Sequence, residues 1–191
     1  MYLKCMKFRY IIYCGRFQPP HYGHLASVML ALKYCNKVCL GIRDTKLSFK
    51  NPLTVKERIE LWKMLLENEN IIDRVIIKPV QDFPKQIITD DKQLDHPLIK
   101  WAKSVEKVFN TSPQYDAFMG NKPHMVLAFN LLGYIVIPAH RNLFRHIDVS
   151  ASKLRQLIIN NDSRWKLMLP KIVVDYLESI NIRERLIMYI R

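Results

Sequence analysis

The chain has 191 residues, of which 49% are hydrophobic and 25% charged, a composition that is typical of one globular domain and excludes disordered or collagen-like chains. A chain of this length buries about 70% of the surface that it exposes when unfolded, so its core needs no disulfide support. Because 30 Lys and Arg residues face 17 Asp and Glu residues, the net charge is +13, which predicts attraction to polyanions such as nucleotides, nucleic acids and acidic lipids.

Apolar runs and helical periodicity alternate along the chain. Five short runs without polar alternation predict strands that are buried on both faces. They are Tyr10–Cys14, Lys37–Leu40, Arg74–Pro79, Asp116–Met119 and Tyr134–Ile137. Helical periodicity covers Leu25–Leu32, Ile59–Leu66, Pro97–Phe109, Met125–Leu132, Ser152–Ile159 and Pro170–Ile180. Thr54, with Glu57 three residues later, is typical of a helix start and places the beginning of the second helix there. This alternation predicts an α/β fold, a Rossmann-like doubly wound parallel sheet of about five strands.

The alternation of strands and helices stops near Asp148, and the rest of the chain is expected to be helical. No linker rich in Pro, Gly or Ser separates the two parts. We therefore expect a single domain over residues 1–191, with a Rossmann-like α/β part at 1–147 and a C-terminal helical part at 148–191. The polar segment Gln81–Asp95 has no clear period and is expected to be a loop over one edge of the site.

The four cysteines, Cys5, Cys14, Cys35 and Cys39, lack the Cys-x-x-Cys spacing of zinc and redox sites, which predicts free thiols. The N-terminal apolar stretch Tyr10–Cys14 is too short for a signal peptide. No run approaches the ~20 apolar residues that cross a membrane. These features predict a cytoplasmic protein without a membrane partner.

The loop after the first predicted strand carries the sequence GRFQPPHYGH, from Gly15 to His24. Ligands of doubly wound sheets bind at the carboxyl ends of the strands, and the free N–H groups of a helix start bind anions. His21 and His24 face the same way on the first helical turn, Gly23 lets a phosphate approach the backbone, and Arg16 adds a planar cation. The loop therefore predicts a phosphate site. The alternative is a pair of surface histidines beside a capped helix, whereas zinc would need further ligands nearby.

The segment Val149–Arg155 predicts a second phosphate site. Ser150 and Ser152 offer hydroxyl groups at a helix start, and Arg155 lies one turn beyond Ser152. Alone, this pattern is typical of a helix N-cap. Together with the two histidines it indicates a site for a phosphate chain.

These motifs resemble those of nucleotidyltransferases that carry a His-x-Gly-His signature, and the lead-in to the histidines resembles the archaeal type of nicotinamide-mononucleotide adenylyltransferase. Further similar stretches follow in the order of that family, from about Tyr10 to Leu186. They are Lys50–Arg58, Pro79–Asp82, Gly120–Asn121, Val149–Arg155, and Trp165 with Leu169–Pro170.

The resemblance implies transfer of the AMP moiety of ATP to nicotinamide mononucleotide, which forms NAD and pyrophosphate. It implies catalytic roles for Arg16, His21, His24 and Arg155. The implied ATP-binding residues are Gly15, Arg16, Phe17, Gln18, His21, Gly23, His24, Lys50, Gly120, Asn121, Ser150, Ser152 and Arg155. Asp82 and Trp101 are implied to contact nicotinamide mononucleotide. The structural alternative for Lys50 is a solvated surface lysine. For Trp101 it is a core residue on an amphipathic helix.

The resemblance also implies a homo-oligomer. The sequence shows no dedicated carboxylate cage, so we expect no metal-ligating residues and a Mg²⁺ ion that is bound mostly by ATP phosphate oxygens and water. The sequence departs from the family pattern in the stretch 42–48, in a longer loop at 83–99, and at Met119, where the family has Ser or Thr. These departures bear on the acceptor substrate more than on the chemistry.

Two other functions stay open. The same fold could transfer a nucleotide from ATP or CTP to another small phosphate, such as phosphopantetheine or FMN. Alternatively, the charge of +13 could mark a non-catalytic module that binds nucleotides or nucleic acid. The dispersed Lys and Arg residues, without an aromatic-interleaved basic cluster, argue against a nucleic-acid partner.

Overall fold

The computed structural model describes residues 8–82, 96–139 and 150–190. The chain forms two compact units. The first comprises Met1–Gly15, Val28–Asp44 and Arg74–Ala139, and the second comprises Arg16–Ser27, Thr45–Asp73 and His140–Arg191. The division therefore does not fall at residue 147, and a single domain with parts at 1–147 and 148–191 stays a prediction. Most of the predicted loop Gln81–Asp95 lies outside the described residues.

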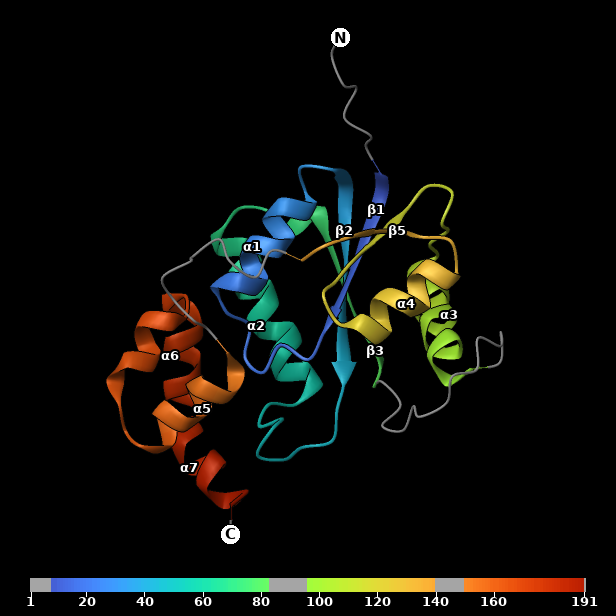
Figure 1. The fold of residues 1–191 in the computed structure, drawn as a ribbon. Coiled ribbons are helices and arrows are strands. Elements are labelled where there is room, and N and C mark those ends of the chain that lie inside the picture. The colour runs from blue at the N-terminus through green and yellow to red at the C-terminus, as the bar shows by residue number, and fades with distance from the viewer. Residues whose placement is uncertain (1–7, 83–95, 140–149, 191) are drawn as a thin grey trace. The chain divides into compact units, whose positions relative to one another are not determined.

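The first unit contains a five-stranded parallel sheet (Figure 1). Its strands are β1 (Phe8–Gly15), β2 (Cys35–Asp44), β3 (Val75–Gln81), β4 (Ala117–Met119) and β5 (Ile135–Ile137). Their order across the sheet is β3-β2-β1-β4-β5. The connections reverse direction at β1, which is the topological switch point of a doubly wound sheet. The predicted Rossmann-like sheet of five parallel strands is confirmed.

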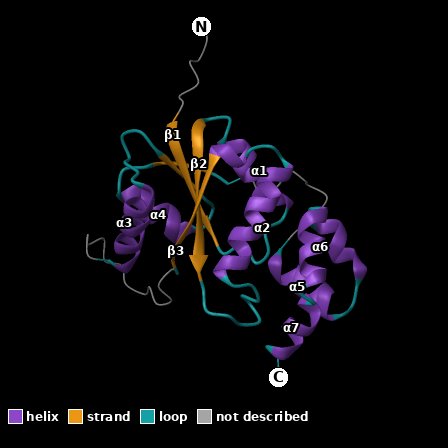
Figure 2. Ribbon diagram, turned by 180° about the vertical axis from the view of Figure 1, so that it is seen from behind, coloured by secondary structure: helices purple, strands orange, loops and turns teal. Residues whose placement is uncertain are grey.

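Helices α3 (Pro97–Phe109) and α4 (Pro123–Leu131) belong to the same unit and lie together on one side of the sheet (Figure 2). They pack on a cluster that includes Ile12 and Phe118, both fully buried. Ile11, which points to the opposite face of β1, is also fully buried. Because neither face of β1 is solvated at this point, its sequence is a continuous apolar run.

Helix α1 (Tyr22–Ala31) connects β1 to β2, and its residues are divided between the two units. A short 3₁₀ helix, η1 (Ile72–Arg74), precedes β3. The predicted start of α2 (Val55–Asn68) is confirmed: Thr54 is its N-cap, and Thr54 and Glu57 form a reciprocal capping box.

The second unit contains α2 and the C-terminal helices. The latter are α5 (Ala151–Ile159), η2 (Ser163–Met168), α6 (Lys171–Ser179) and α7 (Ile182–Met188). Their apolar faces form one cluster with Leu53 and Leu61, and Leu186 is fully buried in it. Near the end of the chain, Met188 and Ile190 are exposed. The helical tail that the sequence predicts is therefore present and packs on the start of α2.

Cys14, Cys35 and Cys39 are buried thiols that form no disulfide, as predicted, whereas Cys5 lies outside the described residues. Among the residues that the structure describes, no helix is long and apolar enough to cross a membrane.

The buried carboxylate of Asp116 ties the start of β1 to the segment before β4. Its side chain has no exposed surface. It accepts hydrogen bonds from Nε and Nη2 of Arg9, at 3.1 and 2.6 Å, and from the backbone N–H groups of Tyr10 and Ser112, at 3.0 and 2.7 Å. These four donors offset the cost of removing a charge from water.

We predict that Asp116→Asn lowers the free energy of unfolding by about 3 kcal/mol, because the amide turns an acceptor into a donor that faces other donors. Denaturant-induced unfolding measures the change. Asp175→Asn is the control, since the exposed ion pair of Asp175 with Lys171 should contribute little. Equal effects of the two substitutions would contradict this account of Asp116.

Candidate functional site

The turn that follows β1 is held in an unusual backbone conformation. Phe17 has a φ of 50°, in the left-handed region, which costs a non-glycine residue about 1–2 kcal/mol. Its ring is buried and lies edge-on to His24, at 4.9 Å between ring centroids, and to Trp62, at 5.2 Å. These tertiary contacts compensate for the strain and aim the turn at the first residues of α1.

The two histidines of the motif form a stacked pair. The carbonyl oxygen of His21 accepts from the backbone N–H groups of His24 and Leu25, at 2.9 and 3.1 Å, so His21 marks the start of the helix. The imidazole centroids are 3.5 Å apart with an angle of 23° between the planes, which confirms that the side chains face the same way. Burial lowers the pKa of His21 to about 4, so its ring is neutral at pH 7.

Arg155 places a largely buried cation in the same unit. It lies on α5, 6% exposed, and its Nη2 donates to the Ser152 hydroxyl at 3.3 Å. Its guanidinium lies over the Phe49 ring at 5.6 Å. Burial and the nearby charge of Arg16 lower the pKa of Arg155. Two guanidinium groups that repel each other favour an anion between or beside them.

Within the described part of the chain, neither Arg16 nor Arg155 has a carboxylate partner. The Nη1 of Arg16 lies 3.5 Å from the Asn51 side-chain oxygen. The adjacent Lys50 is exposed, between Phe49, which contacts Arg155, and Asn51, which contacts Arg16. Arg16, Lys50 and Arg155 thus lie in the same unit, and no carboxylate of the described residues pairs with them.

Ser150 is the N-cap of α5 and accepts from the Lys153 backbone N–H at 3.2 Å. Ser150 therefore acts as the helix N-cap that its sequence pattern, taken alone, predicts. The phosphate contacts of Ser150, Ser152 and Gly23 stay predictions.

Comparison with known proteins identifies the family. Residues 12–157 match the sequence pattern of the cytidylyltransferase-like family. The chain belongs to this family. The match includes the strained turn, the histidine pair and Arg155, so the cluster of positive groups lies within the part of the chain that defines the family.

Two archaeal relatives carry the name nicotinamide-nucleotide adenylyltransferase. The protein from Pyrobaculum aerophilum is 28% identical over 92% of this chain and 90% of its own length. The protein from Sulfurisphaera tokodaii is 29% identical over 92% of this chain and 94% of its own length. Both alignments span nearly whole proteins.

A bifunctional NMN adenylyltransferase/ADP ribose pyrophosphatase from Francisella tularensis, solved with AMP and a manganese ion, has the same fold. Its TM-score is 0.69 and its sequence identity 21%, over 95% of this chain. The chain spans only about half, 52%, of that bifunctional protein.

Five predicted site residues of this cytidylyltransferase-like chain lie in its first unit: Gly15, Asp82, Trp101, Gly120 and Asn121. Gly120 follows β4, and a Cβ there would lie 2.7 Å from the buried Phe118 ring, so a larger residue would force that ring to move. Its N–H donates to the Ile137 carbonyl at 3.0 Å, and the Asn121 amide donates to the Ala139 carbonyl. Both residues fasten the ends of β4 and β5, and their contacts with ATP stay predictions.

Asp82 and Trp101 both have protein partners. Asp82 follows β3 and accepts two bonds from Arg43, through Nε at 3.0 Å and Nη2 at 2.6 Å. Trp101 is 3% exposed, donates from Nε1 to the Gln81 carbonyl at 2.9 Å, and packs edge-on against Phe129. Trp101 thus occupies the core position that its structural alternative predicts, and a contact of either side chain with nicotinamide stays a prediction.

Several residues that contact the predicted site residues in the structure are not predicted from the sequence. Asn51 and Arg58 lie in the stretch Lys50–Arg58, in which only Lys50 has a predicted role, and Phe49 directly precedes that stretch. Arg43 belongs to the departing stretch 42–48, whose first residues extend β2 and pair with β3. The one signal in the sequence for Phe49 and Asn51 is that they are the neighbours of Lys50, a predicted ATP-binding residue.

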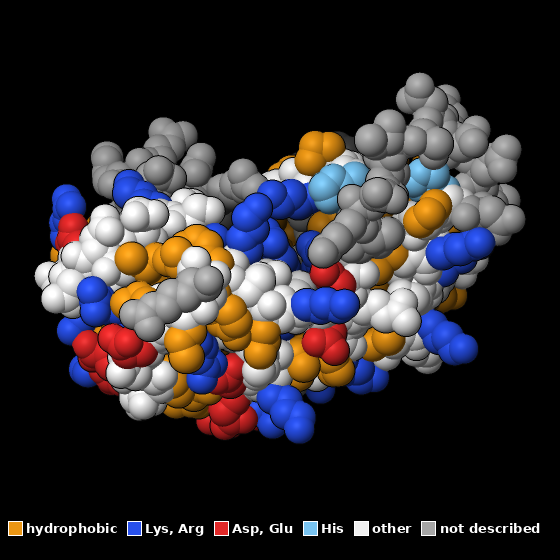
Figure 3. Space-filling model, turned by 90° about the horizontal axis from the view of Figure 1, so that it is seen from below, with side chains coloured by type: hydrophobic (Ala, Val, Ile, Leu, Met, Phe, Trp, Pro, Cys, Tyr) orange, Lys and Arg blue, Asp and Glu red, His pale blue; other side chains and the backbone are white. Residues whose placement is uncertain are grey.

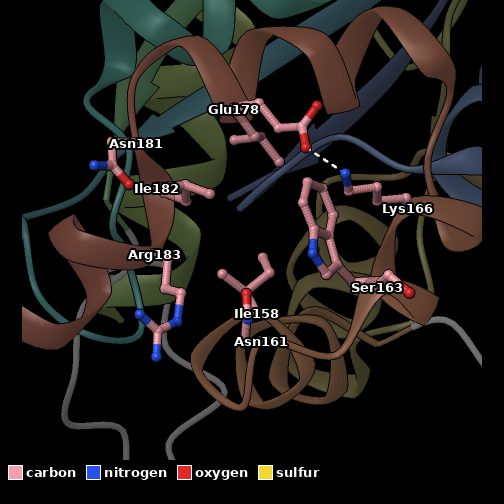
Figure 4. A pocket seen from close by; sticks show the side chains of 10 residues that line it. Ile158, Asn161, Ser163, Lys166, Glu178, Asn181, Ile182 and Arg183 are labelled. Atoms are coloured by element: carbon pink, nitrogen blue, oxygen red, sulfur yellow. Dashed lines mark ion pairs between the residues drawn. The ribbon is translucent and has the colours of Figure 1, made fainter.

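A cavity of about 490 Å³ opens among the C-terminal helices (Figure 4). Trp165 and Lys166 of η2 line one side, and Lys166 forms an ion pair with Glu178 of α6. Arg183 of α7 lines another part of the wall, where its Nε donates to the Ile159 carbonyl at 3.2 Å. The lining contains neither the histidine pair nor Arg155.

Charges of both signs are interspersed on the surface that Figure 3 shows, where Lys and Arg side chains alternate with acidic and uncharged ones. The described residues contain no group of three or more His, Cys, Asp or Glu side chains that could hold a metal ion.

We predict that His21 titrates near pH 4, because burial disfavours its charged form. The unfolded pKa of about 6.5 lies higher, so the neutral ring stabilises the fold above pH 6.5, and this contribution is lost as the pH falls toward 4. Nitrogen-15 NMR of the imidazole measures the pKa, and His21→Gln assigns the signal. A value near 6.5 would contradict the burial described here.

Proposed function

We propose that the chain transfers the AMP moiety of ATP to nicotinamide mononucleotide and releases pyrophosphate. The observation that carries the proposal is the pair of cations in the second unit. Arg155 is largely buried, its pKa is lowered by burial and by the charge of Arg16, and neither arginine has a described carboxylate partner. Such a pair suits the phosphate chain of a nucleotide. The names of the archaeal relatives support ATP and nicotinamide mononucleotide as the substrates.

The reaction needs no nucleophile from the protein. A 5′-phosphate oxygen of nicotinamide mononucleotide attacks the α-phosphorus of ATP, and the bond from the α-phosphorus to the oxygen that bridges to the β-phosphate breaks. The electron pair of that bond leaves with pyrophosphate. Because the attacking phosphate is already an anion, catalysis consists of positioning the reactants and stabilising charge.

Each group of the cluster has a proposed role. Arg16 and His24 hold the α-phosphate, and the neutral His21 donates a hydrogen bond to the phosphate chain. Lys50 and Arg155 hold the leaving pyrophosphate. Ser150 and Ser152 add hydroxyl donors at the start of α5, where the helix dipole favours an anion.

Mg²⁺ is the proposed cofactor and would enter with ATP, bound by phosphate oxygens and water. When bound it neutralises charge on the departing pyrophosphate. The residues described here fit this arrangement, because the positive cluster binds the phosphates directly and leaves their remaining oxygens to the ion. Asp82 and Trp101 are proposed to face the nicotinamide. We also propose a cytoplasmic homo-oligomer, and sedimentation would test the assembly.

Arg155→Met should lower kcat/KM by roughly 10²- to 10³-fold, because it removes one cation that stabilises the transition state. Coupled detection of pyrophosphate from ATP and nicotinamide mononucleotide measures the rate. Arg164→Met is the matched control, since Arg164 pairs with Asp162 on the exposed surface. Similar losses in the two variants would refute a phosphate role for Arg155.

The acceptor is tested by offering nicotinamide mononucleotide, phosphopantetheine and FMN in parallel reactions with ATP and Mg²⁺. We expect pyrophosphate release with nicotinamide mononucleotide alone, and its loss in His24→Ala. Release only with another acceptor would leave the chemistry in place and overturn the substrate. Absence of release with all three would favour a binding module, which nucleic-acid titration at two salt concentrations would examine.

A further inference from the structure

We propose that Arg58 is a positioning residue that sets the affinity for ATP by holding the main chain of the turn after β1. The inference rests on the proposed function, because it takes the turn to bind phosphate. Arg58 is not one of the residues proposed above to contact a ligand. It acts through the backbone of Arg16.

The contacts of Arg58 join two segments that are far apart in the sequence. Its side chain is fully buried. Nε donates to the Thr54 carbonyl at 3.0 Å, one helical turn earlier, and Nη1 donates to the Arg16 carbonyl at 2.7 Å, 42 residues away. A planar guanidinium can serve both acceptors at once, because its donors diverge in a rigid fork. The guanidinium group therefore fixes the loop after β1 relative to the start of α2.

A second bridge joins the same two segments. The Gln18 amide lies 3% exposed and pairs with the Leu53 backbone in both directions. Its Nε2 donates to the Leu53 carbonyl at 2.9 Å, and its Oε1 accepts from the Leu53 N–H at 3.0 Å. Phe17, between Arg16 and Gln18, carries the strained backbone. The strain persists because contacts on both sides determine the conformation.

The segment that holds the turn is itself anchored to the C-terminal helices. The carboxylate of Glu57 closes the capping box with Thr54 and also accepts from Nη1 of Arg185 on α7, at 2.5 Å. Leu53 and Leu61 are fully buried in the C-terminal cluster. The start of α2 is thus a fixed body against which Arg58 can position the turn.

The consequence concerns the direction of the Arg16 side chain. Its carbonyl is fixed by Arg58, and its guanidinium lies close enough to Arg155 to lower the pKa of that residue. Without the bond from Arg58, the turn can relax out of its strained conformation, and the cation moves with it. Because a cation must meet the phosphate chain in a defined place, its displacement weakens binding of ATP without removing any ligand-contacting group.

The test compares Arg58→Lys with wild type by isothermal titration of ATP. Lysine keeps the charge but cannot bond both carbonyls through a planar fork. We expect the Kd for ATP to rise about tenfold, which corresponds to about 1.4 kcal/mol. In the pyrophosphate assay the KM for ATP should rise in parallel, while the KM for nicotinamide mononucleotide stays within about twofold.

Arg74→Lys is the matched control. Arg74 also bonds main-chain carbonyls, those of Leu32, Cys35 and Asn36, but at the amino ends of β2 and β3. It should leave the Kd unchanged, even where it lowers thermal stability. The titration stoichiometry gives the folded fraction, so a partly folded variant still yields a Kd. Deuterium exchange of a peptide covering residues 15–20 should be faster in Arg58→Lys than in the control.

Three outcomes would overturn the inference. If Arg58→Lys unfolds at a lower temperature but binds ATP as wild type does, Arg58 serves stability alone. If Arg74→Lys weakens ATP binding equally, the effect is not specific to the turn. If wild type binds no ATP, the proposed function fails and this inference fails with it.

Discussion

The burial of Arg155 close to a second guanidinium group, that of Arg16, is the constraint that the second unit has to accommodate. Burial of the charged Arg155 destabilises the fold, and repulsion by Arg16 adds to the cost. The chain withstands it because Leu154 and Ile158, the neighbours of Arg155 on α5, are buried in the C-terminal cluster, so the helix cannot rotate to expose the cation. A bound anion would remove the repulsion, so ligand binding and stability of this unit should rise together.

The histidine pair complements these cations without adding to their charge. The His21 and His24 rings stack at 3.5 Å, a separation at which two imidazolium groups would repel strongly. Burial instead keeps His21 neutral, so it offers an N–H donor whose presence does not raise the charge of the cluster. The arginines therefore supply the permanent charge, and the neutral His21 supplies a directional hydrogen-bond donor without adding charge.

Local patterns were predictable from the sequence, and contacts between distant segments were not. The capping box of Thr54 and Glu57 and the facing histidines each involve residues three positions apart, so their geometry follows from the helix itself. The bond from Arg58 to Arg16 spans 42 residues, and no local pattern indicates it. Trp101 shows the same limit, because an amphipathic helix predicts burial of one face but does not say whether a ligand or Phe129 meets the ring.

The short stretch from Lys50 to Arg58 explains how a strained turn can also be a rigid one. Asn51 meets the Arg16 side chain, the Leu53 backbone pairs with Gln18, and Arg58 bonds the Arg16 carbonyl. Because three successive points of one segment contact the turn, movement of the turn requires movement of the start of α2, and that start is packed into an apolar core. Donors held in this way need little reorganisation when charge develops on a phosphate, which is the physical requirement for catalysis by electrostatic preorganisation.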